Sequence, residues 1–528
     1  MFPFHSKHAK FALLAILTFT MFSNSRLSAQ VLPLSTVNVI YRFLPDGITK
    51  SGYSHGDLVY DELIQGADGN FYGTTVQGGS GLCTNGFGFN GCGTIFKLTP
   101  AGVQTVLFNF DLDSNGTTAS NGIYPFGGLV QGPDGNFYGT TTGGGNSQAV
   151  CNGTLGCGVV FKITPAGKFS ILHTFQGALA NPPDGGVPSG RLVLGRDGRF
   201  YGTTFSGGDV QAFANQGTIF SVTVSGAYSV VYMFDNIHGI TDGANPYAGL
   251  IQGQDGALYG TTQFGGTSNA GAVFRFAGGK TTVLHSFTEQ AGQVFPDGAY
   301  PYAALVQASD GNFYGTTSFG GALTTFYQSG TIFRVTKSGT FTKLWDLNAT
   351  NIGVNGNIAY GAMIQASDGN LYGTTLQGGA ANAGTVFQMT LSGALTQLLD
   401  FDMQTDGAYP RSVPLQASDG SLYITTSTTI NGTDQGDVVQ IANGLALPVP
   451  SITLFSPASG KVGAKVTILG KNLLGTTGVS FHGTSATFQV KSTTVVVTQV
   501  PAGATTGPIT ITNAGGSAVS KTSFTVVP

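Results

Sequence analysis

Short apolar runs separated by glycine-centred turns follow one another along most of the chain. The segment Asp297–Leu347 contains four such runs, AALVQ, NFYGTT, GTIFRVT and FTKLWDL. Asp-Gly between apolar runs is a strong hairpin signal, because glycine tolerates positive φ. No stretch keeps the 3.6-residue period of an amphipathic helix. The pattern predicts four antiparallel strands in this segment.

The same unit recurs through the chain. The stretch DGNFYGTT occurs three times and has four near copies, DGRFYGTT, DGALYGTT, DGNLYGTT and DGSLYITT. Self-similarity on this scale indicates a repeat array or a β-propeller. We interpret the aspartate as a turn former rather than a calcium ligand, because the loop lacks further carboxylates at alternating positions. The aspartates lie 51 to 66 residues apart, at Asp68, Asp134, Asp197, Asp255, Asp310, Asp368 and Asp419.

The two ends of the repeat region predict that the array closes. The last repeat ends after its third strand, and a run that resembles a fourth strand, Val37–Phe43, precedes the first repeat. Pairing of Val37–Phe43 with Asp437–Ile441 would complete the last sheet and leave no unpaired edge. We therefore predict an all-β chain in which residues 37–443 form a seven-bladed β-propeller of four-stranded blades, closed by the N-terminal strand.

The chain changes character after the repeats. Residues 444–450 are rich in proline and are predicted to be a linker, and the alternating Val, Thr and Ile of residues 451–528 predict a small β-sandwich. This last segment resembles the IPT/TIG family in Ser456-Pro457, Gly460, VTILGKNL, VSFHG and the closing FTVV. The resemblance implies an immunoglobulin-like domain and brings no catalytic residues with it.

The repeats themselves resemble the tandem repeat of Gloeobacter- and Verrucomicrobia-type bacteria, through the pattern LxQxxDGNFYGTT and the later glycine pair and GTIFK-like strand. The resemblance covers about Val37 to Asn443. It implies an exported protein and adds little about activity.

The N-terminus has the order of a secretory signal peptide. Lys7 and Lys10 precede the apolar run Phe11–Phe22, and Ser28-Ala29 supply a small-residue cleavage site. We predict cleavage after residue 29, although an uncleaved anchor is the alternative. The run is short for a membrane span, and no other stretch is long and apolar enough. The mature chain is expected to be secreted or periplasmic, with no transmembrane segment.

The four cysteines fit an oxidising compartment. Cys83 and Cys92 bracket one loop, and Cys151 and Cys157 bracket the equivalent loop of the next repeat. A metal site is the alternative, but these spacings are not those of zinc sites and no histidine lies near either pair. We predict two local disulfides, Cys83–Cys92 and Cys151–Cys157, and no metal.

Composition narrows the possible functions. Only 9% of the residues are charged, the net charge is -3, and no basic run occurs, so nucleic acid is not an expected partner. No GxSxG, HExxH or P-loop motif is present, and no catalytic residue or cofactor is predicted. The similarly placed His173 and His285 are interpreted as tolerated strand positions rather than metal ligands. The sequence does not predict an oligomeric state.

Departures from the repeat provide the candidate site. The innermost strand carries mostly small residues, but the first repeat has Asp61 and Glu62, the third has Arg191 and the seventh has Arg411. Because buried charges are costly, these groups should face a wet channel or pair with one another. Glu62 and Arg191 share an aligned position and are expected to be partners. They are either part of a ligand site or an ion-paired plug.

A second group of candidates lies beside the first. Tyr247, Tyr302 and Tyr360 occupy the position that Arg411 takes in the last repeat. Such rings could stack on sugars or contact a protein, or they could serve packing alone. The loop that leads into this strand has a polar residue at one aligned position, namely His55, Asn121, Asp184, Asp242, Asp297, Asn355 and Asp406.

Together these features predict an exported, non-enzymatic binding or scaffold protein that contacts carbohydrate or a surface protein through one propeller face. One alternative is an extracellular polysaccharide-active enzyme, a lyase, lactonase or glycosidase, with its site at the propeller channel. A purely structural surface protein is the third possibility. Fold alone does not choose between them.

Overall fold

The structure is a computed structural model. It describes residues 36–43, 59, 62–79, 83, 91–112, 119–146, 149–151, 154–177, 180, 183–207, 216–234, 240–290, 294–321, 329–347, 358–403, 405–428 and 436–528. The predicted signal peptide, residues 1–29, lies outside these ranges, as does Asp61.

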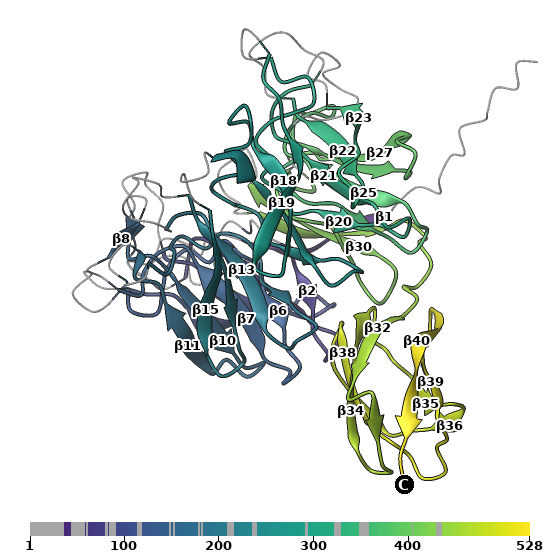
Figure 1. Ribbon diagram of the computed structural model, residues 1–528. Helices are drawn as coiled ribbons and strands as arrows, with labels where there is room; N and C mark the ends of the chain where they lie inside the picture. Colours follow the sequence, from purple (N-terminus) through teal and green to yellow (C-terminus); the bar gives the residue numbers. More distant parts are fainter. Residues whose placement is uncertain are drawn as a thin grey trace, which may run out of the picture.

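The chain is all-β, and four-stranded antiparallel sheets recur along it in a propeller-like arrangement (Figure 1). We number the repeat sheets one to seven in chain order. Sheets one to three consist of β2 (Ile64–Gln65), β3 (Phe71–Thr75), β4 (Thr94–Leu98) and β5 (Gln104–Asn109); β6 (Val130–Gln131), β7 (Phe137–Thr141), β10 (Val159–Ile163) and β11 (Phe169–Thr174); and β12 (Val193–Leu194), β13 (Phe200–Thr204), β14 (Thr218–Val222) and β15 (Tyr228–Met233). A small hairpin, β8 (Val150–Cys151) and β9 (Thr154–Leu155), projects from sheet two.

Sheets four to six repeat this plan. They consist of β16 (Ile251–Gln252), β17 (Leu258–Thr262), β18 (Ala272–Ala277) and β19 (Lys280–Ser286); β20 (Val306–Gln307), β21 (Phe313–Thr316), β22 (Thr331–Val335) and β23 (Phe341–Asp346); and β24 (Ile364–Gln365), β25 (Leu371–Thr375), β26 (Thr385–Met389) and β27 (Leu395–Asp400). A short 3-10 helix, η3 (Ile240–Asp242), precedes sheet four.

The last repeat sheet joins the two ends of the repeat region. It contains β28 (Ala408–Pro410), β29 (Leu415–Gln416), β30 (Leu422–Thr428) and β31 (Asp437–Ala442), and its outermost strand is β1 (Thr36–Arg42). β1 runs antiparallel to β31, with Val37 opposite Ile441 and Arg42 opposite Asp437. This is the pairing that the strand count predicts, and Arg42 Nε also donates to the buried Asp437 carboxylate at 2.9 Å.

The repeated aspartate organises its turn more fully than a turn former alone would. In sheet one, Asp68 Oδ1 accepts the backbone N–H of Asn70, while Oδ2 accepts the Tyr72 hydroxyl at 2.8 Å. The same tyrosine-to-aspartate bond recurs in each repeat sheet. Gly69 has φ of 80°, a conformation that glycine adopts without strain. The Asp-Gly turn and the tyrosine four residues later are therefore one unit.

The glycine and threonines of FYGTT have separate tasks. A Cβ on Gly73 would lie 2.7 Å from the Phe96 ring of the third strand, so glycine makes room for that phenylalanine. The first threonine reaches the next sheet, as when Thr261 Oγ1 donates to the Ala303 carbonyl at 3.2 Å. The second threonine stays within its own sheet, as when Thr75 Oγ1 donates to the Gln77 carbonyl at 2.9 Å.

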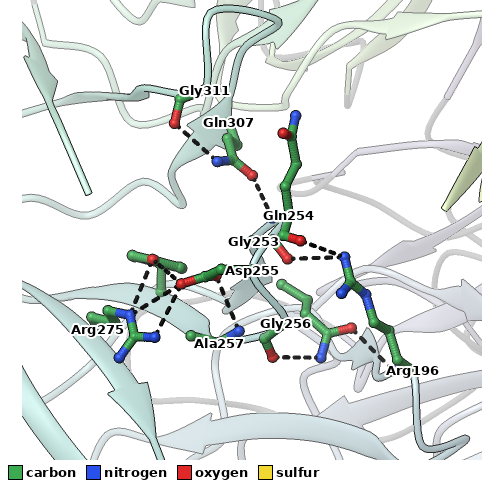
Figure 2. Close-up of polar contacts among 11 residues, drawn as sticks. Arg196, Gly253, Gln254, Asp255, Gly256, Ala257, Arg275, Gln307 and Gly311 are labelled. Atoms are coloured by element: carbon green, nitrogen blue, oxygen red, sulfur yellow. Dashed lines mark hydrogen bonds and ion pairs between the residues drawn. The ribbon is translucent and has the colours of Figure 1, made fainter. Parts of the chain in front are cut away.

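A glutamine at the end of the innermost strand links one sheet to the preceding one (Figure 2). Gln307 Nε2 donates to the Gly311 carbonyl of its own turn at 2.9 Å, and its Oε1 accepts the backbone N–H of Gln254, in sheet four, at 2.8 Å. We call this pair of bonds the glutamine link. It recurs with Gln65, Gln131, Gln252, Gln365 and Gln416, and the link of Gln65 runs from sheet one to Ser418 in sheet seven.

The innermost strands are shorter than the run AALVQ predicts. In sheet five only Val306 and Gln307 pair with β21. The residues before them bond to the preceding sheet instead, through contacts such as Thr261 to Ala303. Backbones come very close there, because a Cβ on Gly190 would lie 2.3 Å from the Gly249 nitrogen. This crowding explains why small residues occupy these positions.

The C-terminal residues form two further sheets (yellow-green to yellow in Figure 1). Val466, Ile468, Phe481, Ile509 and Phe524 are buried in a common core between them. One sheet has the order β32 (Ser451–Ser456), β34 (Lys465–Lys471), β38 (Val495–Gln499) and β37 (Phe488–Ser492). The other has the order β33 (Ser459–Gly460), β40 (Gly516–Val526), β39 (Gly507–Asn513), β35 (Gly478–Phe481) and β36 (Thr484–Ser485).

The segment between repeats and C-terminal sheets is bonded at both ends. Ser367 Oγ donates to the Ala446 carbonyl at 2.6 Å, and Gln416 Nε2 donates to the same carbonyl at 3.3 Å. On the other side, Asn513 Nδ2 donates to the Pro448 carbonyl at 3.0 Å and Asn472 Nδ2 to the Val449 carbonyl at 3.0 Å. Residues 444–450 therefore make specific contacts with both neighbours.

The seventh repeat suggests a test of the glycine–phenylalanine contact. Here Ile424 replaces the glycine, and its register partner Val439 replaces the phenylalanine. Both side chains are buried. We expect Ile424→Gly to lose about 3 kcal/mol through a cavity and Val439→Phe about 2 kcal/mol through overpacking, whereas the double variant recovers most of this loss. Urea unfolding of the four proteins measures the coupling, and simple additivity would show that the two positions do not compensate one another.

The pairing of β1 with β31 gives a second prediction. Arg42→Met keeps the side-chain stem but removes the charge next to the buried Asp437 carboxylate, and should lower the free energy of unfolding by about 2 kcal/mol. Asn38→Ala is the control on the same strand, because the bond of the Asn38 side chain to Gln440 is exposed. Its effect should stay below about 0.5 kcal/mol. Equal effects of both variants in chemical denaturation would contradict the role of the Arg42–Asp437 pair.

Candidate functional site

The predicted site residues that the structure describes lie in two groups on the innermost segments of the repeat sheets. One group is a row of aromatic rings ending in Arg411, and the other is a charged pair, Glu62 and Arg191. Asp61 lies outside the described residues. The ligand role of all these residues stays a prediction.

The aromatic row runs across neighbouring sheets. The Tyr247 and Tyr302 ring centroids are 5.3 Å apart and meet edge to face, and Tyr302 meets Tyr360 in the same way at 5.3 Å. The Arg411 guanidinium lies 5.2 Å from the centroid of the Tyr360 ring, within cation–π range. The three tyrosines are half-buried. The four side chains thus form one continuous, partly exposed surface from sheet four to sheet seven.

Tyr302 is fixed more firmly than stacking alone would fix it. Gln263 Nε2 donates to its hydroxyl oxygen at 2.5 Å. Burial first, and then the neighbouring phenols of Tyr360 and Tyr300, raise the pKa of Tyr302 above its ordinary value. The hydroxyl therefore stays protonated in the neutral pH range and can donate a hydrogen bond to an oxygen.

The charged pair is formed across an intervening sheet. Glu62 belongs to sheet one and Arg191 to sheet three, and their side chains form an ion pair. The aligned position of sheet two is Gly128, which has no side chain to fill the space between them. The Arg191 side chain is 35% exposed and that of Glu62 is 14% exposed, so the arginine is the more accessible partner.

Two aspartates of the loop that leads into the innermost strand, Asp184 and Asp297, have structural partners. His173 Nε2 lies 2.9 Å from Asp184 Oδ2, and His285 Nε2 lies 3.0 Å from Asp297 Oδ2. The His285 ring also stacks on Phe341 of the next sheet, with centroids 3.6 Å apart. These histidines therefore connect an outer strand, a loop and the neighbouring sheet, a role that the interpretation as merely tolerated residues missed. His55 and Asn355 lie outside the described residues.

The cysteines pair as predicted, Cys83 with Cys92 and Cys151 with Cys157. Across the described ranges, no three His, Cys, Asp or Glu side chains gather closely enough to hold a metal ion. In the same ranges, no helix has the length and apolar character needed to cross a membrane.

Sequence reasoning missed the residues that act between sheets. Gln263 and the linking glutamines look like ordinary polar residues of a strand end, although the recurrence of glutamine three residues before the aspartate was a usable signal. Their partners lie in other repeats, 53 residues away for Gln307 and Gln254.

Comparison with protein families identifies the family of the repeats. The profile of the Gloeobacter/Verrucomicrobia repeat matches residues 35–183, 149–296 and 293–490. The chain belongs to the Gloeobacter/Verrucomicrobia repeat family. A comparison of this family member with curated proteins gave no match.

Solved structures similar to this Gloeobacter/Verrucomicrobia repeat protein include a fungal alcohol oxidase of the AA5 family in complex with copper, at 11% identity and a TM-score of 0.46, covering 89% of this chain and 98% of the other. The extracellular domain of a hybrid two component system from B. thetaiotaomicron matches at 11% identity and 0.46, covering 82% of this chain and 45% of the other. A protein of unknown function from Bacteroides thetaiotaomicron matches at 13% and 0.36, covering 79% and 98%. At such values the likeness supports no conclusion about this chain.

Asp406 and Asp297 occupy the same loop position and should respond to pH in opposite ways. Burial first, and then the Asp402 and Asp437 carboxylates, raise the pKa of Asp406 to about 6. Burial also acts to raise the pKa of Asp297, but hydrogen bonds from His285 and Thr288 outweigh it and hold that pKa below its ordinary value.

The folded-state pKa of Asp406 exceeds its unfolded value, so its favourable contribution is complete below about pH 3.9 and is lost as pH rises through 6. Asp406→Asn should therefore raise the melting temperature relative to wild type at pH 8 and lose this advantage near pH 4. Asp297→Asn is the matched control, and it should lower the melting temperature above pH 4, with a deficit that shrinks on acidification. The same pH trend in both variants would show that the two environments do not differ.

Proposed function

We propose that this is an exported binding or scaffold protein, in which a seven-bladed β-propeller contacts carbohydrate, or a surface protein, through one face. Residues 37–443 would form the propeller, residues 444–450 the linker and residues 451–528 an IPT/TIG immunoglobulin-like domain. The sequence of the first 29 residues and the two disulfides support an oxidising location outside the cytoplasm.

The row formed by Tyr247, Tyr302, Tyr360 and Arg411 is the observation that carries the proposal. A tyrosine offers a flat apolar surface together with a hydroxyl, and it loses little conformational entropy when it binds. One face of a sugar ring presents C–H groups that pack on such a surface, while its hydroxyls bond to groups such as the Tyr302 hydroxyl. A charged side chain at the end of the row favours a ligand that also carries polar or acidic groups.

The propeller supports the proposal by the way its sheets are joined. The link of Gln65 to Ser418 connects the first sheet with the last, and β1 completes the last sheet. A closed array would hold the rings of four different repeats at fixed separations. Such a surface is preorganised, which reduces the entropy cost of binding.

A glycan array with the purified mature chain tests the proposal, followed by calorimetry on any ligand found. Tyr302→Ala should weaken binding about tenfold or more, because it removes the central ring of the row, whereas Tyr302→Phe keeps the ring and should weaken it less. Tyr41→Ala, on the outermost strand β1, is the control and should leave affinity unchanged.

Equal affinity of wild type and Tyr302→Ala would exclude the row as the binding surface. Glu62→Gln separates the two roles of the charged pair, since a ligand site loses affinity and a plug loses only stability. Cleavage of a bound glycan by the wild type, abolished in Glu62→Gln, would favour the polysaccharide-active enzyme instead.

A further inference from the structure

The interface between sheets two and three lacks the glutamine link, because both the accepting and the donating position carry other residues. We call such an interface between consecutive repeat sheets a seam. At the other seams a glutamine accepts a backbone N–H from the residue before the repeated aspartate. At seam 2–3 the accepting position is Leu194 and the donating position is Pro133, which has no N–H. Donor and acceptor are therefore lost together, and neither is left buried without a partner.

Apolar contacts take the place of the link at this seam. Leu194 packs against a buried cluster that includes Val130 and Tyr138 of sheet two and Phe200 of sheet three. The Tyr138 and Phe200 rings stack with centroids 4.2 Å apart. Comparable tyrosine-to-phenylalanine stacks occur at seams that keep the link, such as Tyr259 on Phe313 with centroids 3.9 Å apart. The stack therefore does not by itself make up for the missing link.

The disulfide Cys151–Cys157 lies in the same seam. Cys151 and Cys157 both belong to the buried cluster shared by sheets two and three. A Cβ on Gly186, in the segment that enters sheet three, would lie 2.6 Å from Cys151 Sγ, so the disulfide packs directly on that backbone. The Val187 backbone N–H also donates to the Cys157 carbonyl at 2.9 Å, which is a bond across the seam.

Seam 1–2 offers a comparison within the same molecule. The Tyr124 backbone N–H donates to the Cys92 carbonyl at 2.9 Å, in the position equivalent to Val187 and Cys157. The disulfide Cys83–Cys92 fixes this acceptor. Here, however, Gln131 also links the sheets through the Ala67 N–H. Seam 1–2 thus has a glutamine link and a disulfide, and seam 2–3 has a disulfide without the link.

We propose that seam 2–3 is a redox-dependent closure, held by the disulfide Cys151–Cys157 in place of a glutamine link. Reduction by a dithiol transfers two electrons and two protons to the two sulfurs. The S–S bond breaks, two thiols form and the dithiol becomes its own disulfide. The Cys157 carbonyl is then held less firmly against the Val187 N–H, and seam 2–3 opens more readily than a seam that keeps its glutamine. Loss of Cys83–Cys92 leaves seam 1–2 closed by Gln131.

Hydrogen exchange of the full chain tests the proposal through two reporter amides, Val187 for seam 2–3 and Tyr124 for seam 1–2. In Cys151→Ala/Cys157→Ala, exchange in peptides containing Val187 should become faster on the order of tenfold, as expected for release of a short closed loop. In Cys83→Ala/Cys92→Ala, peptides containing Tyr124 should change little. Adding Gln131→Leu to the latter variant should make Tyr124 behave like Val187.

The reciprocal variant installs the missing link. Pro133→Ser/Leu194→Gln, in the otherwise wild-type chain treated with dithiothreitol, should slow the exchange of Val187 back toward the oxidised rate. This arm needs no cysteine replacement and stays informative if the alanine variants do not fold. Equal acceleration of both reporters on reduction, acceleration throughout the chain, or no protection from the installed link would each overturn the proposal.

Discussion

A glutamine side chain that bonds to its own turn and to the turn of the neighbouring sheet joins most consecutive repeat sheets. The rest of the architecture depends on such contacts, because a single repeat sheet cannot cover its own two faces. Its neighbours must bury them, and its innermost strand has only two paired residues to hold it in place. Each repeat gains its core from the next one, through ring stacks such as Tyr259 on Phe313 and threonine bonds such as Thr261 to Ala303. This explains why the repeat stretch changes so little, because almost every residue in it has a partner in its own sheet or in an adjacent one.

The same constraint explains where the chain can vary. At the innermost segments backbones approach so closely that small residues are required, as at Gly190 and Gly249. Glu62 and Arg191 are larger and charged, and the aligned residue of the sheet between them, Gly128, leaves room for their side chains to meet. Glu62, Arg191 and Arg411 are therefore exceptions to the repeat, whereas Tyr247, Tyr302 and Tyr360 recur at one aligned position. Both groups lie on repeat sheets that are held by these contacts. Sites built on such rigid elements hold their side chains at defined separations.

Compensation between positions is a second consequence. In the seventh repeat, Ile424 is larger than the glycine it replaces, and its partner Val439 is smaller than the phenylalanine it replaces. At seam 2–3, Pro133 removes a hydrogen-bond donor and Leu194 removes the matching acceptor. In both cases a change in one side chain is tolerated because its contact partner changes as well. Leaving one partner of a buried contact unmatched costs more than replacing both.

Local chemistry was enough to predict the hairpins at Asp-Gly, the short strands and the two disulfides, because each of these depends on residues close in the chain. Counting strands at the two ends also predicted the pairing of β1 with β31. The aligned positions of Glu62 and Arg191 predicted that they pair. The pair forms only because sheets one and three approach each other across sheet two. The recurring glutamines and the aligned tyrosines are visible in the sequence, but the partners of the glutamine links, the ring contacts along the tyrosine row and the bond of Ser367 to Ala446 have no local signal. Those contacts join residues from different repeats, so only the packing of one sheet on the next decided them.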